Sequence, residues 1–428
     1  MTGKINDRLN MLKVISGTRN GVNPETLIDV YQALIRSVIE YGCTVTNNAC
    51  KTNKNRLVVS NNQCLRKITG CTKSTPLNTL IALARQEPLE TRQEYLTAKF
   101  ITKCFTKNNL IANQLKQINQ EADEEKLSYM EKVYLKHKKI IEKVMTNVSE
   151  RQIQVEVQST MDGMDTAKRN CNPLQLRQLA IQTINGKWEN RPKMYTDASK
   201  MKGLCGIGVY DEGTGARYCY RLEMESSITS AEISAIETAL DVIDLQEKQD
   251  YVILTDSRSA CEMLSIAMET KNRPAVLNGI LEKAEKWSVS FQWIPGHARI
   301  TGNELADFLA KSGTSDTAER RNNQIFEKDA FLLFKHWRKQ TATEWYKTYA
   351  EEKGKKYYQI QQELGETPWH YGKGFNNAET RLLNRLVAGH DFSPHWLAIM
   401  KIVHQGSGEI CDEENTAEHI ILNCETLD

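Results

Sequence analysis

The sequence lacks long apolar runs, and no stretch approaches the roughly 18 uncharged apolar residues that a membrane-spanning helix needs. The N-terminal stretch MTGKINDRLN also lacks the apolar segment of a secretory leader. The eleven cysteines of the whole sequence are an odd number and lack the regular spacing of a disulfide framework. We therefore expect an intracellular protein, nuclear or cytoplasmic and not secreted, with reduced thiols and no membrane contact.

No internal repeat is present in the 428 residues, a length that suits about two to four domains. Charge is unevenly distributed, although the whole chain has a net charge of only +2. Residues 1–115 hold 16 Lys and Arg against 7 Asp and Glu, whereas residues 191–313 hold 14 against 18. This asymmetry suggests that the basic segment contacts a polyanion, although so modest a bias also suits a solvated surface.

The N-terminal region has the start and stop signals of helices. In NPETLIDVYQALIRSVIEYG, Asn23 is a good N-cap, the proline after it suits the first helical position, and Gly42 suits the end. A second helix is predicted to end at Gly70, and a third to follow Pro88. We expect this helical region to cover residues 1–115.

From Lys193 onward, the spacing of the apolar residues changes from a helical pattern to that of strands. The runs KMYTDAS, CGIGVYD and ARYCYRLEM predict three short strands, and YVILT predicts a strand buried on both faces. A fifth strand is predicted at SVSFQWI. With the helices between them, the elements of residues 191–313 predict an α/β arrangement, a mixed five-stranded sheet with flanking helices. Residues 116–190 are expected to form a charged exposed helix and a polar linker. Residues 314–428 are expected to be helical, with tryptophans that pack between helices.

Four acidic residues fall where this fold would bring them together. Asp197 and Asp256 each end a predicted strand, Glu232 lies in the first turn of the first predicted helix of residues 191–313, and Asp307 lies in the last helix. If the two strands are neighbours, both aspartates emerge at one edge of the sheet. Four carboxylates at one point raise one another's pKa, so the cluster needs cations, and oxygen ligands select Mg²⁺ or Mn²⁺. Two such ions can activate a water and stabilise the leaving oxygen of a phosphodiester.

Each residue taken alone has an ordinary structural alternative. Asp256 could be the N-cap of the helix SRSACEML, and Glu232 and Asp307 could be solvated helix residues. His297, which follows Pro-Gly, could be a simple turn residue. The joint pattern favours the metal site, because every acid falls where the fold needs it.

The segments YTDAS, SAEISAI, LTDSRSA and WIPGHARITGNELAD resemble the four motif blocks of type 1 ribonuclease H. They come in the family's order, with the family's spacing between His297 and Asp307. The resemblance covers residues 191–313 and implies the α/β ribonuclease H-like fold. The resemblance further implies cleavage of the RNA strand of RNA–DNA hybrids, without a small-molecule cofactor. It also implies that the four acids bind two Mg²⁺ or Mn²⁺ ions and that His297 assists proton transfer and product departure. Thr229 and Ser257 match positions where the family approaches the backbone of the hybrid.

The flanking segments resemble other parts of a retroelement polyprotein. The segment RLNMLKVISGTRNGVNPETLIDVYQALIRSVIEYG resembles the thumb-side region that follows the polymerase palm in non-LTR (LINE-type) retrotransposon reverse transcriptases. The tail, beginning ETRLLNRLVAGHD, is similar to the C-terminal end of the same polyproteins. The Tyr-x-Asp-Asp motif of the palm is absent, so we expect no DNA polymerisation by this chain alone.

The same resemblance suggests a zinc site in the tail. Family tails often read C-x₂-C-x₇-H-x₄-C, and here Cys411, His419 and Cys424 keep the last three positions. Gly408 occupies the first position, and a structural zinc site normally needs four ligands. The site is therefore either degenerate or completed by His404.

The leading interpretation is a Mg²⁺-dependent ribonuclease that acts on hybrids. The alternative is a non-catalytic, nucleic-acid-binding remnant of a retroelement, against which the complete set of four acids argues. An integrase or another nuclease of the broader superfamily would not be expected to carry the block from His297 to Asp307.

Overall fold

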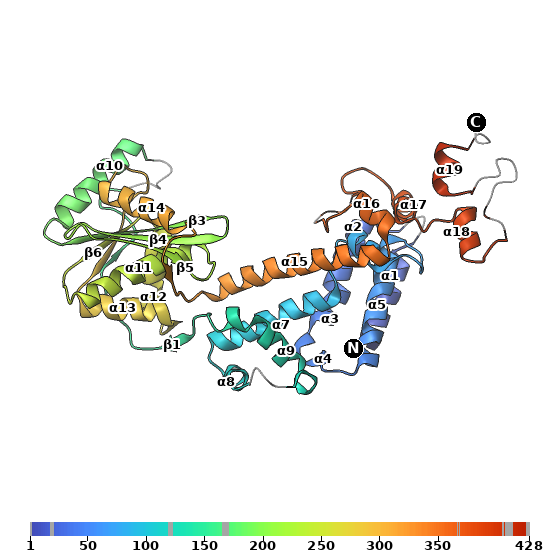
Figure 1. Ribbon diagram of the computed structural model, residues 1–428, viewed down its shortest axis with the longest axis horizontal. Helices are drawn as coiled ribbons and strands as arrows, with labels where there is room; N and C mark the ends of the chain where they lie inside the picture. The colour runs from blue at the N-terminus through green and yellow to red at the C-terminus, as the bar shows by residue number, and fades with distance from the viewer. Residues whose placement is uncertain are drawn as a thin grey trace. The chain divides into compact units, whose positions relative to one another are not determined.

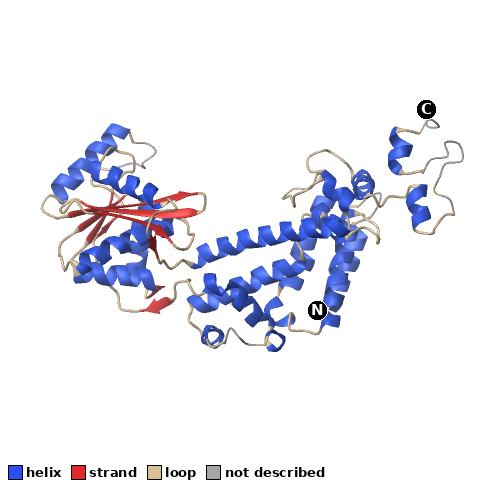
Figure 2. Cartoon of the chain, viewed as in Figure 1, coloured by secondary structure: helices blue, strands red, loops and turns tan. Residues whose placement is uncertain are grey.

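The computed structural model describes residues 2–17, 21–118, 123–164, 171–365, 367, 369–404, 406 and 414–424. The chain divides into two compact units, one of Met1–Thr97, Asp123–Val133 and Lys335–Asp428, the other of Ala98–Ala122 and Tyr134–Phe334. All strands of the described residues belong to the second unit, and the first is helical (Figure 2). No helix of the described residues is both long and apolar enough to cross a membrane.

The second unit is built around a seven-stranded sheet of order β2-β8-β6-β3-β4-β5-β9. Strand β3 pairs in parallel with β6 and antiparallel with β4, so the sheet is mixed. The expected five-stranded mixed sheet with flanking helices is confirmed, and two-residue strands extend it at both edges. The strands are β2 (Val157–Gln158), β3 (Lys193–Met201), β4 (Leu204–Asp211), β5 (Arg217–Leu222), β6 (Val252–Thr255), β8 (Ser290–Trp293) and β9 (Arg320–Arg321). Strands β1 (Asn147–Ser149) and β7 (Asn272–Pro274) form a separate antiparallel pair.

Helices cover both faces of the sheet (Figure 1). One face carries α11 (Ile228–Leu245), α12 (Arg258–Glu269) and α13 (Ala275–Lys286), and the other carries α10 (Pro173–Gln182) and α14 (Thr301–Gly313). Successive side chains of a strand point to opposite faces, so β3 contributes to two cores. Met194 packs with Ile233 of α11, whereas the next residue, Tyr195, packs with Ala306 of α14.

The segment before the sheet differs from the polar linker that the sequence suggested. Ile153 is fully buried in the core beneath α11, and β2 pairs in parallel with β8. Trp188 is also buried and donates a hydrogen bond from Nε1 to Oε1 of Gln292, at 3.1 Å. The linker prediction was wrong here because these apolar residues lie in irregular backbone and show no helical or strand period. Helix α10 and the π-helix η4 (Thr183–Lys187) complete this segment.

The remaining helices of the second unit precede and follow this segment. Helix α8 (Leu110–Lys116) lies wholly within the second unit. Residues of both units are found in α7 (Leu89–Thr106), α9 (Tyr129–Ile141) and α15 (Glu327–Glu352). Within the second unit, Phe105 stacks on Tyr134 with 5.5 Å between ring centroids. Tyr134 is fully buried, so the charged segment holding it is more than an exposed helix.

The first unit confirms the helix signals read from the sequence. Asn23 caps the first of them, its Oδ1 accepting a hydrogen bond from the backbone N–H of Thr26 at 2.9 Å. Gly42 and Gly70 end helices at φ +70° and +71°, in the left-handed region that glycine adopts without strain. The elements here are α1 (Thr2–Ile15), α2 (Pro24–Tyr31), η1 (Gln32–Arg36), α3 (Ser37–Glu40), α4 (Cys43–Thr46), α5 (Lys51–Thr69), α6 (Leu77–Leu83), η2 (Glu124–Lys126), α16 (Lys355–Ile360), α17 (Asn377–Ala388), α18 (Pro394–Ile399) and α19 (Ala417–Leu422).

The N-terminal and C-terminal segments pack together within the first unit. Asn384 of α17 donates a hydrogen bond to the carbonyl oxygen of Thr69 at 3.0 Å, and Arg385 donates one to that of Gly70 at 2.7 Å. Tyr346 is fully buried against Leu80, which supports helix packing as the role of the C-terminal aromatics. Two segments that are far apart in the sequence therefore share one core.

Candidate active site

Two neighbouring strands bring the first two acids together. Strands β3 and β6 run in parallel with Thr196 opposite Thr255, so Asp197 and Asp256 follow at adjacent positions. Asp256 follows the end of β6, but β3 continues to Met201 through its pairing with β4, so the prediction that Asp197 ends its strand was wrong. Glu232 comes from α11, in its second turn rather than the expected first, because the helix begins at Ile228. Carboxylate oxygens of Asp197, Glu232 and Asp256 all lie within 4.8 Å of one another.

Burial and mutual repulsion make this cluster costly to ionise. The pKa of Asp197 is raised to about 7, first by burial and then by the charge of Asp256. The pKa of Glu232 is raised well above its usual value by burial, and then by the charges of Asp197 and Asp256. The carboxylates can all be ionised at neutral pH only where a cation offsets their repulsion.

The geometry and chemistry of the three acids fit a hard divalent cation. Oε2 of Glu232 is buried and has no hydrogen-bond partner among the described residues. All three side chains offer carboxylate oxygens, the ligands that Mg²⁺ and Mn²⁺ prefer. An acceptor left without a donor in a buried carboxylate cluster is well suited to a metal ion.

Asp307 lies on the opposite face of the sheet, on α14. Its charge is a further cause of the raised pKa of Asp197, so the fourth acid faces the same site. One of its oxygens, Oδ2, is 2.5 Å from Nζ of Lys311, one helical turn later. Sequence reasoning missed this lysine, although the i,i+4 spacing on a helix would have indicated it.

His297 occupies a strained loop beside the site. Its φ of +60°, together with +56° at Arg299, places two non-glycine residues in the left-handed region. Gly296 precedes it, and a Cβ there would lie only 2.3 Å from Oδ2 of Asp256. The side chain of His297 is exposed and lines a cavity of about 490 Å³ that also includes Leu176 of α10. The loop therefore passes directly over Asp256 and presents His297 to solvent.

The two weaker substrate-binding predictions fall near the site. Ser257 is the N-cap of α12, and its Oγ accepts a hydrogen bond from the N–H of Ala260 at 3.3 Å. The alternative that Asp256 caps this helix was therefore wrong. Thr229 is half-buried in the first turn of α11. Contact of Ser257 and Thr229 with a nucleic-acid backbone stays a prediction.

The zinc ligands suggested by the sequence are only partly described. Cys411 and Gly408 lie outside the described residues. His419 is buried in α19, Cys424 is half-buried, and His404 is exposed. Zinc binding in the tail stays a prediction, since the described residues hold only part of the ligand set.

The region around these acids was compared with known proteins. The sequence model of the RNase H family matches residues 189–315. These residues form an RNase H domain. The match encloses the sheet from β3 to β8 and the four acids, and it confirms the expected fold.

The chain is also similar to retroviral polyproteins. It is 33% identical over 139 residues to the Pol polyprotein of Equine infectious anemia virus, in strain Wyoming and in isolates 1369 and CL22. Each match covers 32% of this chain and 11% of the viral polyprotein. The chain thus spans about a tenth of the length of the curated relatives it matches.

A residue beyond the family match supports the helix that carries Glu232. Asp329 is buried, with 2% of its surface exposed, and its Oδ1 accepts a hydrogen bond from the N–H of Ser227, the N-cap of α11, at 2.9 Å. Its Oδ2 accepts one from Oγ of Ser230 at 2.6 Å. Asp329 thereby fixes the first turn of α11 through Ser230, which is two residues before Glu232.

We expect Asp329→Ala to lower stability and to weaken metal-dependent activity together. Each buried donor left unpaired costs about 1–3 kcal/mol, and loosening the start of α11 shifts Glu232. The cleavage rate should fall by about tenfold to a hundredfold, because small misplacements of reacting groups have effects of that size. A higher Mg²⁺ concentration should also be needed for the half-maximal rate. Asp316→Ala is the control, because that side chain is 88% exposed and its ion pair with Arg221 is of the surface kind that contributes little. It should leave both quantities nearly unchanged. A lower melting temperature with an unchanged Mg²⁺ requirement would mean that Asp329 is only structural.

Proposed function

We propose that the RNase H domain of this chain hydrolyses the RNA strand of RNA–DNA hybrids with Mg²⁺ or Mn²⁺. The observation that carries this proposal is the convergence of Asp197, Glu232 and Asp256 within 4.8 Å, inside the segment that matches the family. With Asp307 from the opposite face, these acids would hold the metal. When bound, two such ions would activate a water and stabilise the leaving oxygen of a phosphodiester.

The protein side chains around the acids have separate tasks in this proposal. Asp197 and Glu232 hold their oxygens in a buried site, where charge interactions are stronger than in water. His297, exposed on the loop over Asp256, would carry a proton to or from the departing product. Thr229 and Ser257 would contact the hybrid backbone, and discrimination for RNA would require sensing the 2′-OH.

We also propose an origin for the chain in a retroelement polyprotein. The flanking segments support descent from a non-LTR retrotransposon polyprotein, with residues 1–115 derived from the thumb side of its reverse transcriptase. Packing of the N-terminal and C-terminal segments into one helical unit supports their retention as a folded body. The tail would then be a degenerate form of that polyprotein's zinc-binding end.

We expect the purified full-length protein to cut the RNA of a labelled RNA–DNA hybrid and to leave 3′-hydroxyl and 5′-phosphate ends. Mg²⁺ or Mn²⁺ should be required, because the buried carboxylates need a cation to be ionised together. Gel analysis of hybrid, duplex DNA and duplex RNA, each with Mg²⁺ and with EDTA, measures this. Equal cutting of all three duplexes, or cutting that survives EDTA, would contradict the proposal. No cutting at all would favour the non-catalytic remnant.

A further inference from the structure

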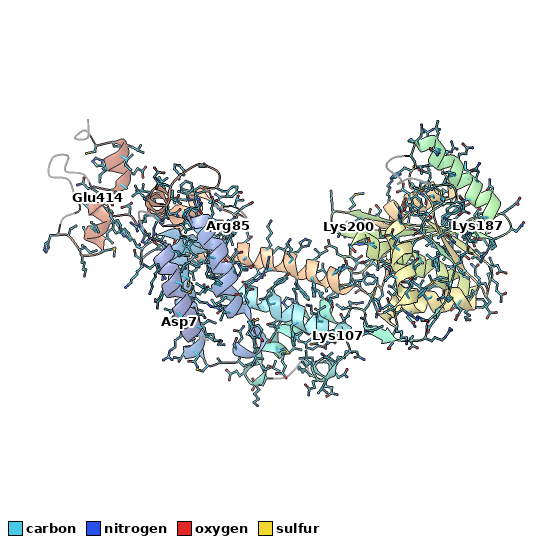
Figure 3. All side chains as sticks on the ribbon, turned by 180° about the vertical axis from the view of Figure 1, so that it is seen from behind. Asp7, Arg85, Lys107, Lys187, Lys200 and Glu414 are labelled. Carbon is cyan, nitrogen blue, oxygen red and sulfur yellow. The ribbon has the colours of Figure 1, made fainter. Side chains whose placement is uncertain are left out.

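The first unit contains a cavity of about 460 Å³ with an excess of positive charge. It is bounded by η1, by the turn between α6 and α7, and by the part of α15 that belongs to this unit. Arg85, labelled in Figure 3, lies on the turn beside α15. Five cationic residues and one acid line the cavity: Arg36, Arg85, Lys335, Arg338, Lys339 and Glu87. The lining therefore carries a net charge of about +4, which favours a polyanion.

The inner wall of this cavity is held in place by side-chain contacts. Arg36 donates a hydrogen bond from Nη1 to Oε1 of buried Gln86 at 2.6 Å, and its Nε forms an ion pair with Oε1 of Glu40 at 2.5 Å. Nε of Arg338 lies 3.1 Å from Oε2 of Glu87, and its guanidinium lies 4.5 Å from the centre of the Tyr95 ring. Both arginines are half-buried, so their positions are set before any ligand arrives. These arginines and their acidic partners give the cavity a fixed polar inner wall, and the unpaired positive charge lies at the rim.

The rim of the cavity offers charge that the protein does not neutralise. Lys335 and Lys339 are exposed and lie one turn apart on α15, so their side chains are neighbours. Neither ammonium group has an acidic partner within 4.0 Å among the described residues. A phosphodiester backbone supplies one negative charge per nucleotide, so its phosphates can pair with the two rim lysines.

We propose that this cavity binds the phosphate backbone of a nucleic-acid strand and thereby holds the hybrid at a site outside the RNase H domain. The inference rests on the proposed function for the identity of the nucleic acid, an RNA–DNA hybrid. The acidic RNase H segment, with 14 Lys and Arg against 18 Asp and Glu over residues 191–313, needs attraction from elsewhere in the chain. The sequence suggested residues 1–115 for this role, and the cavity adds lysines of α15 to them.

The test is a charge reversal at the rim, Lys335→Glu with Lys339→Glu, in the full-length protein. Binding of a fluorescent hybrid is measured in EDTA, so that no cleavage occurs, at about 50 and 200 mM salt. Loss of two phosphate contacts should flatten the slope of log affinity against log salt concentration by about 1.8. The ratio of wild-type to variant affinity should therefore be about tenfold larger at the lower salt concentration than at the higher one. Unchanged affinity and slope in this variant would overturn the inference.

Two matched variants separate the cavity from general charge. Lys353→Glu with Lys355→Glu removes the same charge from exposed residues of the same unit that do not line the cavity. It should keep most of the affinity, and an equal loss in both reversals would overturn the inference. Lys335→Arg with Lys339→Arg should bind like the wild type. Loss of binding in this pair would mean that charge is not what the cavity supplies.

Two further arms identify the occupant and separate the two proposals. If pyrophosphate binding depends on the rim lysines while hybrid binding does not, the cavity holds a small phosphate compound and the inference fails. Cleavage is assayed separately with Mg²⁺. A wild-type protein that binds through Lys335 and Lys339 but never cuts would defeat the proposed function alone. One that cuts, yet binds independently of these lysines, would defeat the cavity inference alone.

Discussion

Asp256→Asn should reduce hybrid cleavage to near background and should also make the metal-free protein more stable. Activity should be lost because a neutral amide replaces a charged carboxylate in the cluster that would hold the metal. Stability should rise because Asp256 is, after burial, the largest cause of the raised pKa of Asp197. Removing that repulsion is worth on the order of 1 kcal/mol, or about 2–4 °C in the unfolding of a unit of this size. Cleavage rates with Mg²⁺ measure the first effect, and thermal unfolding in EDTA at pH 8 measures the second.

The pH dependence of this stability has a definite sign. The folded pKa of Asp197, about 7, lies above the unfolded value of 3.8, so the folded state binds the proton more tightly. The metal-free wild type should therefore lose stability as pH rises from about 4 to 7, and Asp256→Asn should show a smaller loss. Added Mg²⁺ should stabilise the wild type and not the variant, because ligands that bind only the folded state raise its stability. Wild-type rates in the variant would refute the metal site, and equal stability in EDTA would refute the electrostatic argument.

The fold of the RNase H domain could be predicted because its signals are local. Strand β6 is a continuous apolar run that Asp256 directly follows, and Asp197 comes after a similar run, Met194 to Thr196, within β3. Parallel pairing of the two strands then places Asp197 beside Asp256 without further assumptions. In SAEISAIETALDVI, Ile233 and Ile236 recur at helical spacing, which indicates the buried face of α11, and both are buried in the core.

Contacts without a local signal could not be predicted. Ile153 and Trp188 complete the cores on either side of the sheet from irregular or short segments, where no period of 2 or 3.6 develops. Asp329 reaches the start of α11 from about 100 residues later in the chain. The cationic cavity joins Arg36 to Lys335, and only the folded chain brings such distant residues together. Sequence patterns report the environment of one element, not which distant element it meets.

Gly208→Ala should destabilise the RNase H domain and displace the helix that carries Asp307. Gly206 and Gly208 lie on the same face of β4, and α14 packs against them with its backbone. A Cβ on Gly208 would lie 2.3 Å from the carbonyl oxygen of Ala306 and 2.5 Å from the backbone nitrogen of Ala310. Both atoms belong to the helix backbone, so the helix itself must move outward. Inserting a methyl into so tight a contact should cost about 3 kcal/mol or more.

The same movement should lower the cleavage rate, because Asp307 directly follows Ala306 on the displaced helix. A shift of about 1 Å in a reacting group can cost about 100-fold in rate, and this is the loss we expect at temperatures where the variant remains folded. Gly213→Ala is the matched control, because a Cβ there meets nothing closer than 3.5 Å and its backbone is not left-handed. Chemical unfolding and single-turnover cleavage of both variants measure the two effects. If Gly208→Ala loses stability but cleaves at the wild-type rate, the position of α14 is not critical for the site, and Asp307 has no essential part in holding the metal.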